Sequence, residues 1–372
     1  MQADNPLPWT DRHWDDLRAV ALESARKSRV ASTFLPLVGP FPADQATVPS
    51  NWLQFADPAA GVHEPRLAVR SGRTLQLVTL SCNIYLRGSE IADPNLDAAK
   101  SMIRRAGEVL GRLEDAVVFY GLPPDGQAAQ RFERMRVLPP IYTISGDNDQ
   151  TGLLNAPATL VAAEEGGPAD TPERAAIRQA SVTRGRQQAL GVAAAAFDGL
   201  YQAAEDAAGK QLMCVLIEAP QAVGGAAQRD VDGTDLVRGI IDAIQRLETR
   251  GHFGPFAVVL GHDLFSLATM PADSLVLPSD RLGEFLDGRR VQRSGVLPTD
   301  RGVVVALGGQ PIELVLASDI DVRFLQATLE PRYVLRVFER LVLRIKELDA
   351  VCVVTTNPRR LNPDVIARRV RR

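Results

Sequence analysis

His262 and Asp263 are the neighbouring residues of this 372-residue chain that are best suited to acid–base chemistry. They come after the apolar residues 257–260, which predict a buried strand. Polar side chains at the end of such a strand can form an active site or a subunit interface. The sequence places no nucleophile motif beside the pair. Asp263 is also a good cap for a helix over residues 263–268, so a capping pair is the favoured interpretation.

Two further pairs have the spacing of known chemistry. Ser24 and Lys27 fit the Ser-x-x-Lys spacing of some acyl-transfer enzymes, but their companion motifs are absent, so we attribute the match to chance. Glu114 and Asp115 resemble paired catalytic carboxylates. Adjacent helix positions point about 100° apart, so the two cannot readily share a site. We expect them at a solvated or interface edge.

The sequence has no spacing typical of a metal centre, a disulfide framework or a nucleotide site. The histidines have no cysteine or carboxylate partner at a diagnostic interval: His13, His63, His252 and His262. The cysteines are far apart and lie in apolar segments, so we expect buried thiols: Cys82, Cys214 and Cys352. We therefore expect no catalytic residue, no metal ligand and no cofactor.

The composition is that of an ordinary globular protein, with 45% hydrophobic and 23% charged residues. Its length allows two domains or one large elaborated domain. A net charge of -3 gives no overall attraction to nucleic acid or to an anionic membrane. The first residues lack the pattern of a signal peptide, and no apolar run is long enough to span a bilayer. We expect a cytoplasmic protein.

The N-terminal elements are a helix, an arm and a hairpin. Thr10 is the expected cap of an amphipathic helix whose buried stripe contains Trp14, Leu17, Ala21 and Ala25. Residues 34–52 are rich in proline and predict an extended arm. Residues 66–87 predict a hairpin that turns at Ser71 and Gly72, and its alternation slips between Leu77 and Val78.

The clearest element is a long helix, with Asp93 as cap, Pro94 at its first position and Gly121 as its end. Its apolar residues recur every three or four positions: Leu96, Ala99, Ile103, Ala106, Leu110, Leu113, Val117 and Tyr120. At 1.5 Å per residue, the helix would be roughly 40 Å long. Such a helix can act as the spine of a domain.

The second half mixes helices and strands. We expect helix over residues 173–208, a strand over 211–220, a helix capped by Thr234 and a hairpin around Gly308 and Gly309. Residues 332–348 alternate like a strand, although their apolar spacing would also serve a helix. A basic tail with six arginines in the last fourteen residues is interpreted as a solvated end.

Several segments, in order, resemble the encapsulins, shell proteins related to the capsid proteins of HK97-type tailed phages. HWDDLRAVALESARK and FLPLVGPF are similar to that family's N-terminal helix and arm, and LEDAVVFYG resembles the end of its spine helix. TGLLNAP, FGPFAVVLGHDLF, GGQPIELVLASDIDVRF and ELDAVCVV are similar to its later turns and strands. Departures at ASTF, ASD and Arg323–Phe324 alter the residues around the family's cargo-docking surface.

The resemblance implies an α+β fold of the HK97 capsid type. It implies an N-terminal helix and arm (1–49), an E-loop β-hairpin (50–87), a P-domain spine helix (88–121), an A-domain (122–317), P-domain C-terminal strands (318–356) and a basic C-terminal tail (357–372). Compact family members have no counterpart to residues of about 162–233, so the A-domain is expected to carry an insertion there.

The implied function is structural: an icosahedral homo-oligomeric nanocompartment in the cytoplasm that self-assembles and encloses cargo. The expected partners are further copies of the chain and a cargo protein with a short targeting peptide, such as a ferritin-like protein or a peroxidase. No nucleic acid or membrane partner is expected. A phage or prophage major capsid protein is an alternative with the same fold, and a soluble enzyme that uses His262 and Asp263 is a third, less favoured one.

Two sites follow from the resemblance. The hypothesised cargo groove is formed by Trp14, Leu17, Ala21, Phe34, Ile320 and Phe324. An equally favoured alternative is that these side chains only pack the helix onto its own subunit. The loop at the five-fold pore is expected to contain Met270, Pro271, Ala272, Asp273 and Ser274, with Asp273 facing the channel. The alternative there is an ordinary exposed turn.

Overall fold

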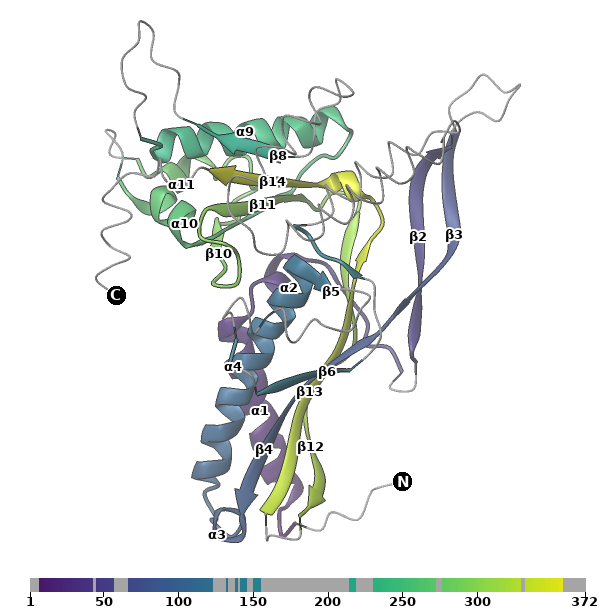
Figure 1. Ribbon diagram of the computed structural model, residues 1–372, viewed down its shortest axis with the longest axis vertical. Helices are drawn as coiled ribbons and strands as arrows, with labels where there is room; N and C mark the ends of the chain where they lie inside the picture. Colours follow the sequence, from purple (N-terminus) through teal and green to yellow (C-terminus); the bar gives the residue numbers. More distant parts are fainter. Residues whose placement is uncertain are drawn as a thin grey trace, which may run out of the picture. The chain divides into compact units, whose positions relative to one another are not determined.

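A computed structural model describes residues 7–42, 45–56, 66–122, 132, 138–139, 141–145, 150–154, 214–218, 230–271, 276–328 and 332–356 (Figure 1). The chain divides into two compact units. Unit 1 contains Met1–Gln150 and Glu313–Lys346, and unit 2 contains Thr151–Ile312 and Glu347–Arg372. The helix expected over 173–208, the basic tail and most of the insertion lie outside the described residues.

Two helices run side by side in unit 1 (Figure 1). Helix α1 (Asp11–Ser28) has Thr10 as its N-cap and buries the expected stripe. Helix α4 (Asp97–Tyr120) buries seven of the eight residues of the predicted stripe, because one face packs on α1 and another on the sheet of unit 1. The eighth, Leu96, is buried just before the helix begins. Two short helices lie between α1 and α4 in the sequence: α2 (Ala31–Phe34) follows α1, and α3 (Gly88–Ile91) precedes α4.

The predicted start of the long helix is wrong by several residues. Asp93 caps a turn instead, since its carboxylate accepts hydrogen bonds from the backbone N–H groups of Asn95 and Asp97, at 3.0 Å each. Leu96 then takes a left-handed conformation with φ of 55°, and the helix begins after it.

Close approach of α1 and α4 depends on two glycines of α4. A Cβ atom at Gly107 would lie 2.6 Å from the carbonyl oxygen of Ala21, and one at Gly111 would lie 2.8 Å from that of Ala25. Any side chain at these positions would collide with backbone, so the two helix backbones lie almost in contact. The apolar stripe of α1 is therefore covered mainly by α4.

The sheet of unit 1 has the strand order β1-β12-β13-β4-β6. Its strands are β1 (Leu37–Val38), β12 (Ile312–Ala327), β13 (Arg332–Ile345), β4 (Val78–Arg87) and β6 (Tyr142–Ser145). The strand predicted within 332–348 is confirmed over Arg332–Ile345. It pairs antiparallel with β4 from Arg332 opposite Arg87 to Leu341 opposite Val78.

The hairpin lies one strand earlier than predicted. Strands β2 (Thr47–Ala56) and β3 (Arg66–Gln76) form an antiparallel pair, so part of the proline-rich arm is a strand and β3 continues through Ser71 and Gly72 without turning. The slip in alternation at Leu77 marks the end of β3. After it, β4 joins a different sheet and therefore buries a different set of side chains.

Unit 2 has a second sheet with the order β10-β9-β11-β14-β8. Its strands are β10 (Gln292–Arg293), β9 (Phe256–Leu260), β11 (Arg301–Ala306), β14 (Val351–Thr356) and β8 (Cys214–Ile217). Helix α9 (Gly233–Thr249) packs on three of these strands, and α10 (His262–Thr269) and α11 (Pro278–Arg281) pack against α9. The 3-10 turn η1 (Leu348–Ala350) precedes β14.

Two sequence-based assignments in this region are wrong. The cap of α9 is Asp232, whose carboxylate accepts hydrogen bonds from the N–H groups of Thr234 and Asp235. Gly308 and Gly309 do form a turn, but it joins β11 of one sheet to β12 of the other, so no hairpin forms there. The short strands β5 (Gly121–Leu122) and β7 (Gln150–Thr151) pair with each other.

Candidate functional site

The residues of the hypothesised cargo groove lie on α1, on α2 and on β12. Five of them are buried within the described protein: Trp14, Leu17, Ala21, Phe34 and Ile320. Phe324 is half-buried. The set therefore exposes little surface besides Phe324, because α4 already covers the middle of the α1 stripe.

A side-chain ion pair links helix α1 to strand β12. The guanidinium Nε of Arg18 on α1 donates to the Oδ1 of Asp321 on β12 at 2.9 Å. Farther along β12, the Arg323 guanidinium lies 5.0 Å from the ring centre of Phe338 on β13. Leu325, which follows Phe324, is 41% exposed.

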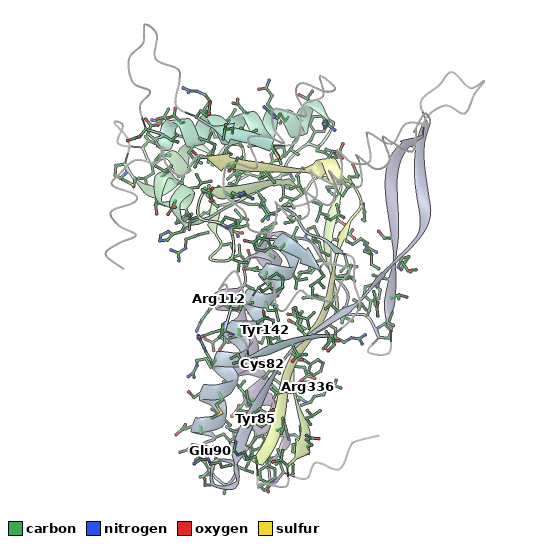
Figure 2. All side chains as sticks on the ribbon, viewed as in Figure 1. Cys82, Tyr85, Glu90, Arg112, Tyr142 and Arg336 are labelled. Carbon is green, nitrogen blue, oxygen red and sulfur yellow. The ribbon has the colours of Figure 1, made fainter. Side chains whose placement is uncertain are left out.

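The neighbouring strands add aromatic and cationic side chains to the surface of the same sheet. Tyr85 on β4 is 53% exposed. Arg336 on β13 donates from its Nε to the side-chain oxygen of Asn83 at 3.1 Å (Figure 2). Cys82, on the same strand as Tyr85, is buried, and burial raises the pKa of its thiol to about 11. All three cysteines are buried free thiols, as expected.

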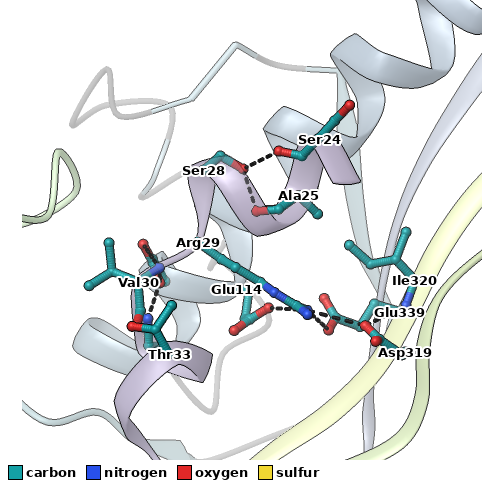
Figure 3. A network of polar contacts seen from close by, with 12 residues as sticks. Ser24, Ala25, Ser28, Arg29, Val30, Thr33, Glu114, Asp319, Ile320 and Glu339 are labelled. Atoms are coloured by element: carbon teal, nitrogen blue, oxygen red, sulfur yellow. Dashed lines mark hydrogen bonds and ion pairs between the residues drawn. The ribbon is translucent and has the colours of Figure 1, made fainter. Parts of the chain in front are cut away.

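A buried charged cluster joins the end of α1 to α4 and to the sheet (Figure 3). We call it the Arg29 cluster and define it as Arg29, Glu114, Asp319 and Glu339. The Arg29 Nη1 lies 3.4 Å from Glu114 Oε2, 3.1 Å from Asp319 Oδ1 and 3.6 Å from Glu339 Oε1. Glu114 and Glu339 have no solvent exposure.

One guanidinium faces three carboxyl groups in this cluster, so their protonation is shifted. Burial raises the pKa of Glu339 well above its usual value; the charge of Glu114 acts in the same direction and that of Arg29 opposes both. Burial also raises the pKa of Glu114, although Arg29 lowers it. Burial lowers the pKa of Arg29, but the three carboxylates outweigh this and the net shift is upward.

Asp115 has a separate structural role next to the cluster. Its Oδ1 accepts hydrogen bonds from the backbone N–H groups of Val30, at 2.9 Å, and Ala31, at 2.8 Å. Asp115 thus holds the start of α2, where the chain leaves α1. Burial raises its pKa to about 8, with a contribution from Glu114 in the same direction.

The expectation for Glu114 and Asp115 is therefore wrong in one respect. Their side chains do point to different partners, as the angle between adjacent helix positions predicts. They lie at a fully buried end of α4, however, and not at a solvated edge. The sequence signal that was overlooked is the apolar run that surrounds them, residues 116–120, which predicts burial of the whole helix end.

The other candidate catalytic residues have structural contacts. The hydroxyl of Ser24 donates to the carbonyl of Val20 at 2.7 Å, and Lys27 pairs with Glu23 at 2.6 Å, so Ser24 and Lys27 do not act together.

His262 and Asp263 lie in the first turn of α10. Asp263 is buried, and His262 is half-buried with its Nδ1 3.4 Å from the Ser266 hydroxyl. The N-cap of α10 is Gly261, not Asp263. The Thr299 carbonyl accepts hydrogen bonds from the N–H groups of Asp263 and Leu264, at 2.9 and 3.2 Å, so backbone takes the place of a capping side chain.

Part of the expected pore loop follows α10. Met270 is half-buried and Pro271 is exposed. Ala272, Asp273 and Ser274 lie outside the described residues. On the far side of that gap, Val276 is 49% exposed.

Comparison with known proteins identifies relatives of part of the chain. Residues 217–342 match the family model Linocin_M18, described as encapsulating protein for peroxidase. A curated relative, the type 1 encapsulin shell protein EncA of Myxococcus xanthus, is 36% identical over 117 residues, which are 31% of this chain and 40% of that protein. The chain thus spans less than half the length of this relative.

Among solved structures, the virus-like particle of Pyrococcus furiosus is similar over 92% of this chain and 99% of its own, with 13% identity and a TM-score of 0.50. At that identity the likeness concerns the fold alone. None of the helices in the described residues combines the length and the hydropathy of a membrane span. The family match and the fold together confirm the resemblance seen in the sequence: residues 217–342 carry encapsulin family sequence, and the chain has the α+β fold of HK97-type capsid proteins.

Proposed function

We propose that the chain is the shell protein of an icosahedral nanocompartment that assembles from many copies of itself and encloses cargo. The observation that carries this proposal is that the same chain has both a family match and a fold similarity to shell-forming proteins. The family match covers residues 217–342, while the fold likeness to a virus-like particle extends over 92% of the chain. The role is structural, with no reaction catalysed by the shell.

The hairpin β2–β3 supports self-assembly on physical grounds. Its base is anchored in unit 1 by a small apolar core formed by Val48, Leu77, Val315, Ala317 and Val342. The hairpin forms a two-stranded sheet of its own. An isolated two-stranded hairpin is at best marginally stable in water, so a packing surface is expected from a neighbouring copy. Closed shells use such repeated, extended contacts.

The domain assignment belongs to this proposal. In it, α4 and the strands β12, β13 and β4 form the P-domain, and β2–β3 is the E-loop. The sheet of unit 2 with α9 and α10 forms the A-domain, with the insertion of about 162–233 as its elaboration. The arm, residues 29–49, would extend contacts between copies.

We place the shell in the cytoplasm, with a cargo enzyme bound through a short targeting peptide. The description of the matched family, encapsulating protein for peroxidase, supports a peroxidase as one candidate cargo. A ferritin-like protein is the other. Shell copies and this cargo are the proposed partners, without nucleic acid or membrane.

For the cargo groove, the open position is Phe324, because the other five residues of the set are buried. An apolar peptide side chain would contact Phe324 and the exposed edge of α1 close to the Arg18–Asp321 ion pair. Phe324→Asp should abolish cargo co-purification while shells keep their normal size. Leu325→Asp is the matched control, since successive side chains of a strand point to opposite faces. Equal cargo loading in both variants would refute the groove.

For the pore, we propose that Asp273 faces the five-fold channel and favours cations. Asp273→Arg shells should take up divalent cations more slowly than wild-type shells, because a ring of positive charge opposes their entry. Asp280→Arg, an exposed change on α11, is the control. Unchanged uptake in the Asp273→Arg shells would exclude the pore role.

Sedimentation velocity of the purified chain tests self-assembly. The proposal requires a megadalton species when the protein is expressed without cargo. Sedimentation as monomers or dimers at every concentration would contradict it. Such a result would favour the soluble-enzyme alternative, whereas assembly only together with portal and scaffold proteins would favour a phage capsid.

A further inference from the structure

Three side chains of unit 2 that are far apart in sequence converge on one point. His252 follows α9, while Glu347 and Asp349 lie just before β14 and within η1. One nitrogen of His252 and one carboxylate oxygen from each acid all lie within 4.8 Å of one another. His252 is 94% buried, with 6% of its surface exposed. Both acids are half-buried.

The backbone holds His252 in place. Gly251 takes a φ of +89°, which allows the chain to turn sharply after α9. The N–H of His252 then donates to the carbonyl of Leu247 at 3.0 Å. In the segment that carries the two acids, the N–H of Glu347 donates to the carbonyl of Pro311 at 3.4 Å. The side chains therefore project from ordered backbone, as a binding site requires.

The contact between His252 and Asp349 is close but misaligned for a hydrogen bond. Nε2 of His252 lies 2.8 Å from Oδ1 of Asp349. Nε2 is nevertheless without a hydrogen-bond partner among the described residues, so the ring N–H direction does not point at that oxygen. Nδ1 lies 3.5 Å from Oε2 of Glu347, too far for a strong bond.

This geometry is what two ligands of one ion show. Two donors at right angles, each about 2.1 Å from a metal, lie about 3.0 Å apart, and the nitrogen lone pair points about 45° away from the oxygen. A shared ion would explain both the short distance between His252 Nε2 and Asp349 Oδ1 and the poor alignment of the ring with that oxygen. A buried nitrogen with no aligned hydrogen-bond partner among the described residues is otherwise costly.

The charges also fit a cation. With a neutral imidazole, Glu347 and Asp349 supply two negative charges, which a divalent ion would balance. Burial lowers the pKa of His252, but Asp349 and Glu347 outweigh it and raise the pKa overall, while Arg250 opposes them. Burial raises the pKa of Asp349, but the contact with His252 and the charge of Arg250 lower it further.

We propose that His252, Glu347 and Asp349 bind a divalent transition-metal cation within unit 2. One imidazole and two carboxylates form a donor set of nitrogen and oxygen that suits Zn²⁺, Mn²⁺ or Fe²⁺. The ion would join the turn after α9 to the segment that enters β14. Protons compete for the same nitrogen, so affinity decreases as the pH decreases through the pKa of His252.

Titration of tag-free, chelator-treated protein with Co²⁺, followed by visible absorption at pH 8, tests the site. One Co²⁺ per chain should bind with the spectrum of mixed nitrogen and oxygen ligation, and binding should be weaker at pH 5.5. Added Zn²⁺ should compete with Co²⁺ and should raise the Tm of the protein, because it binds the folded state.

The variants His252→Asn and Glu347→Gln locate the ion. The first should abolish Co²⁺ binding. The second should weaken the affinity at least about tenfold, because mutation of even an outer-sphere partner of a metal ligand lowers metal affinity by about that factor. His262→Asn on α10 is the control and should bind as wild type does. If His252→Asn fails to fold, Glu347→Gln alone decides the matter. Absence of Co²⁺ binding to the wild type, or equal binding in Glu347→Gln, would overturn the proposal.

Discussion

At the scale of single residues, the Arg29 cluster concentrates the electrostatics of unit 1. Its members come from positions 29, 114, 319 and 339, so no sequence motif could have indicated it. Removal of two carboxyl groups from water is unfavourable unless each is neutral or paired. One guanidinium cannot neutralise all of its neighbours, and the structure relieves this by favouring the protonated form of Glu339.

The first prediction concerns Glu339→Gln, which keeps the shape of the protonated carboxyl group. Because the pKa of Glu339 is higher in the folded state than its usual value of 4.5, its stabilising effect is complete below pH 4.5 and is lost as the pH rises through the folded-state pKa. The glutamine side chain does not ionise, so the variant keeps this stability as the pH rises. At pH 8 its Tm should exceed that of the wild type by about 2–4 °C, the shift that about 1 kcal/mol gives in a domain of about 150–250 residues.

Thermal unfolding at pH 4.5 and pH 8 provides the measurement. The two proteins should have similar Tm values at pH 4.5 and diverge at pH 8. Glu108→Gln, on the exposed part of α4, is the control and should leave the pH profile unchanged. A lower Tm for Glu339→Gln at pH 8 would show that Glu339 is ionised and paired with Arg29.

The second prediction concerns Arg29→Met, which removes the cation and keeps most of the side-chain volume. The buried carboxyl groups then lose their only positive partner in the cluster. Removal of one member of a buried ion pair costs about 3–5 kcal/mol, and the free energy of unfolding should decrease by that amount. Arg26→Met on the exposed face of α1 is the matched control. Equal stabilities of the two variants in urea unfolding would contradict this role.

At the scale of elements, the periodicity of apolar residues predicted which faces are buried. Local turn signals failed where the pairing partner of a strand lies far away in the sequence. The buried stripes of α1 and α4 and the strand over 332–345 follow from spacing alone. The hairpin was misplaced because Ser71 and Gly72 resemble a turn, yet the partner of β3 is β2 and not β4. The turn at Gly308 and Gly309 resembled a hairpin turn, but β11 pairs with β9 and β14, and β12 pairs with β13 and with β1, where Leu37 lies opposite Leu314.

The candidate site shows the same difference between what local spacing predicts and what long-range packing determines. The sequence placed Trp14, Leu17 and Ala21 correctly on one face of α1, and in the structure the Arg18–Asp321 ion pair links α1 to β12. The sequence could not reveal that α4 would cover this face, because the close approach depends on glycines ninety residues away. The cluster of His252, Glu347 and Asp349 was missed for a similar reason, since only the fold of unit 2 brings its members together.

The third prediction tests the packing of α1 on α4 through Gly107→Ala. Alanine has the higher helix propensity by about 1 kcal/mol, so propensity alone predicts a more stable protein. The added Cβ would lie 2.6 Å from the carbonyl oxygen of Ala21, so the helices must separate. Overpacking of this kind costs about 1–3 kcal/mol, and we expect a net decrease in the free energy of unfolding.

Gly88→Ala is the matched control for this prediction. Gly88 is also a helical glycine, at the start of α3, and a Cβ there would meet nothing within 4 Å. Its free energy of unfolding should be unchanged or slightly higher. If Gly107→Ala is as stable as Gly88→Ala in chemical denaturation, α1 does not lie against α4 as closely as the structure indicates.

At the scale of the whole molecule, the chain has a capsid-type fold, and its residues 217–342 match the family described as encapsulating protein for peroxidase. A hairpin with a sheet of its own is poorly stabilised within one copy. It becomes more stable when it packs on a neighbouring copy. The described residues thus have the features of a subunit that completes its structure by assembly.

Cryo-electron microscopy of the wild-type chain, expressed without any cargo protein, tests the central claim most directly. We predict closed hollow particles with icosahedral symmetry, built from this chain alone, in which β2–β3 of each copy packs on a neighbouring copy. Fields that contain only monomers, dimers or open sheets under all conditions tried would contradict the account.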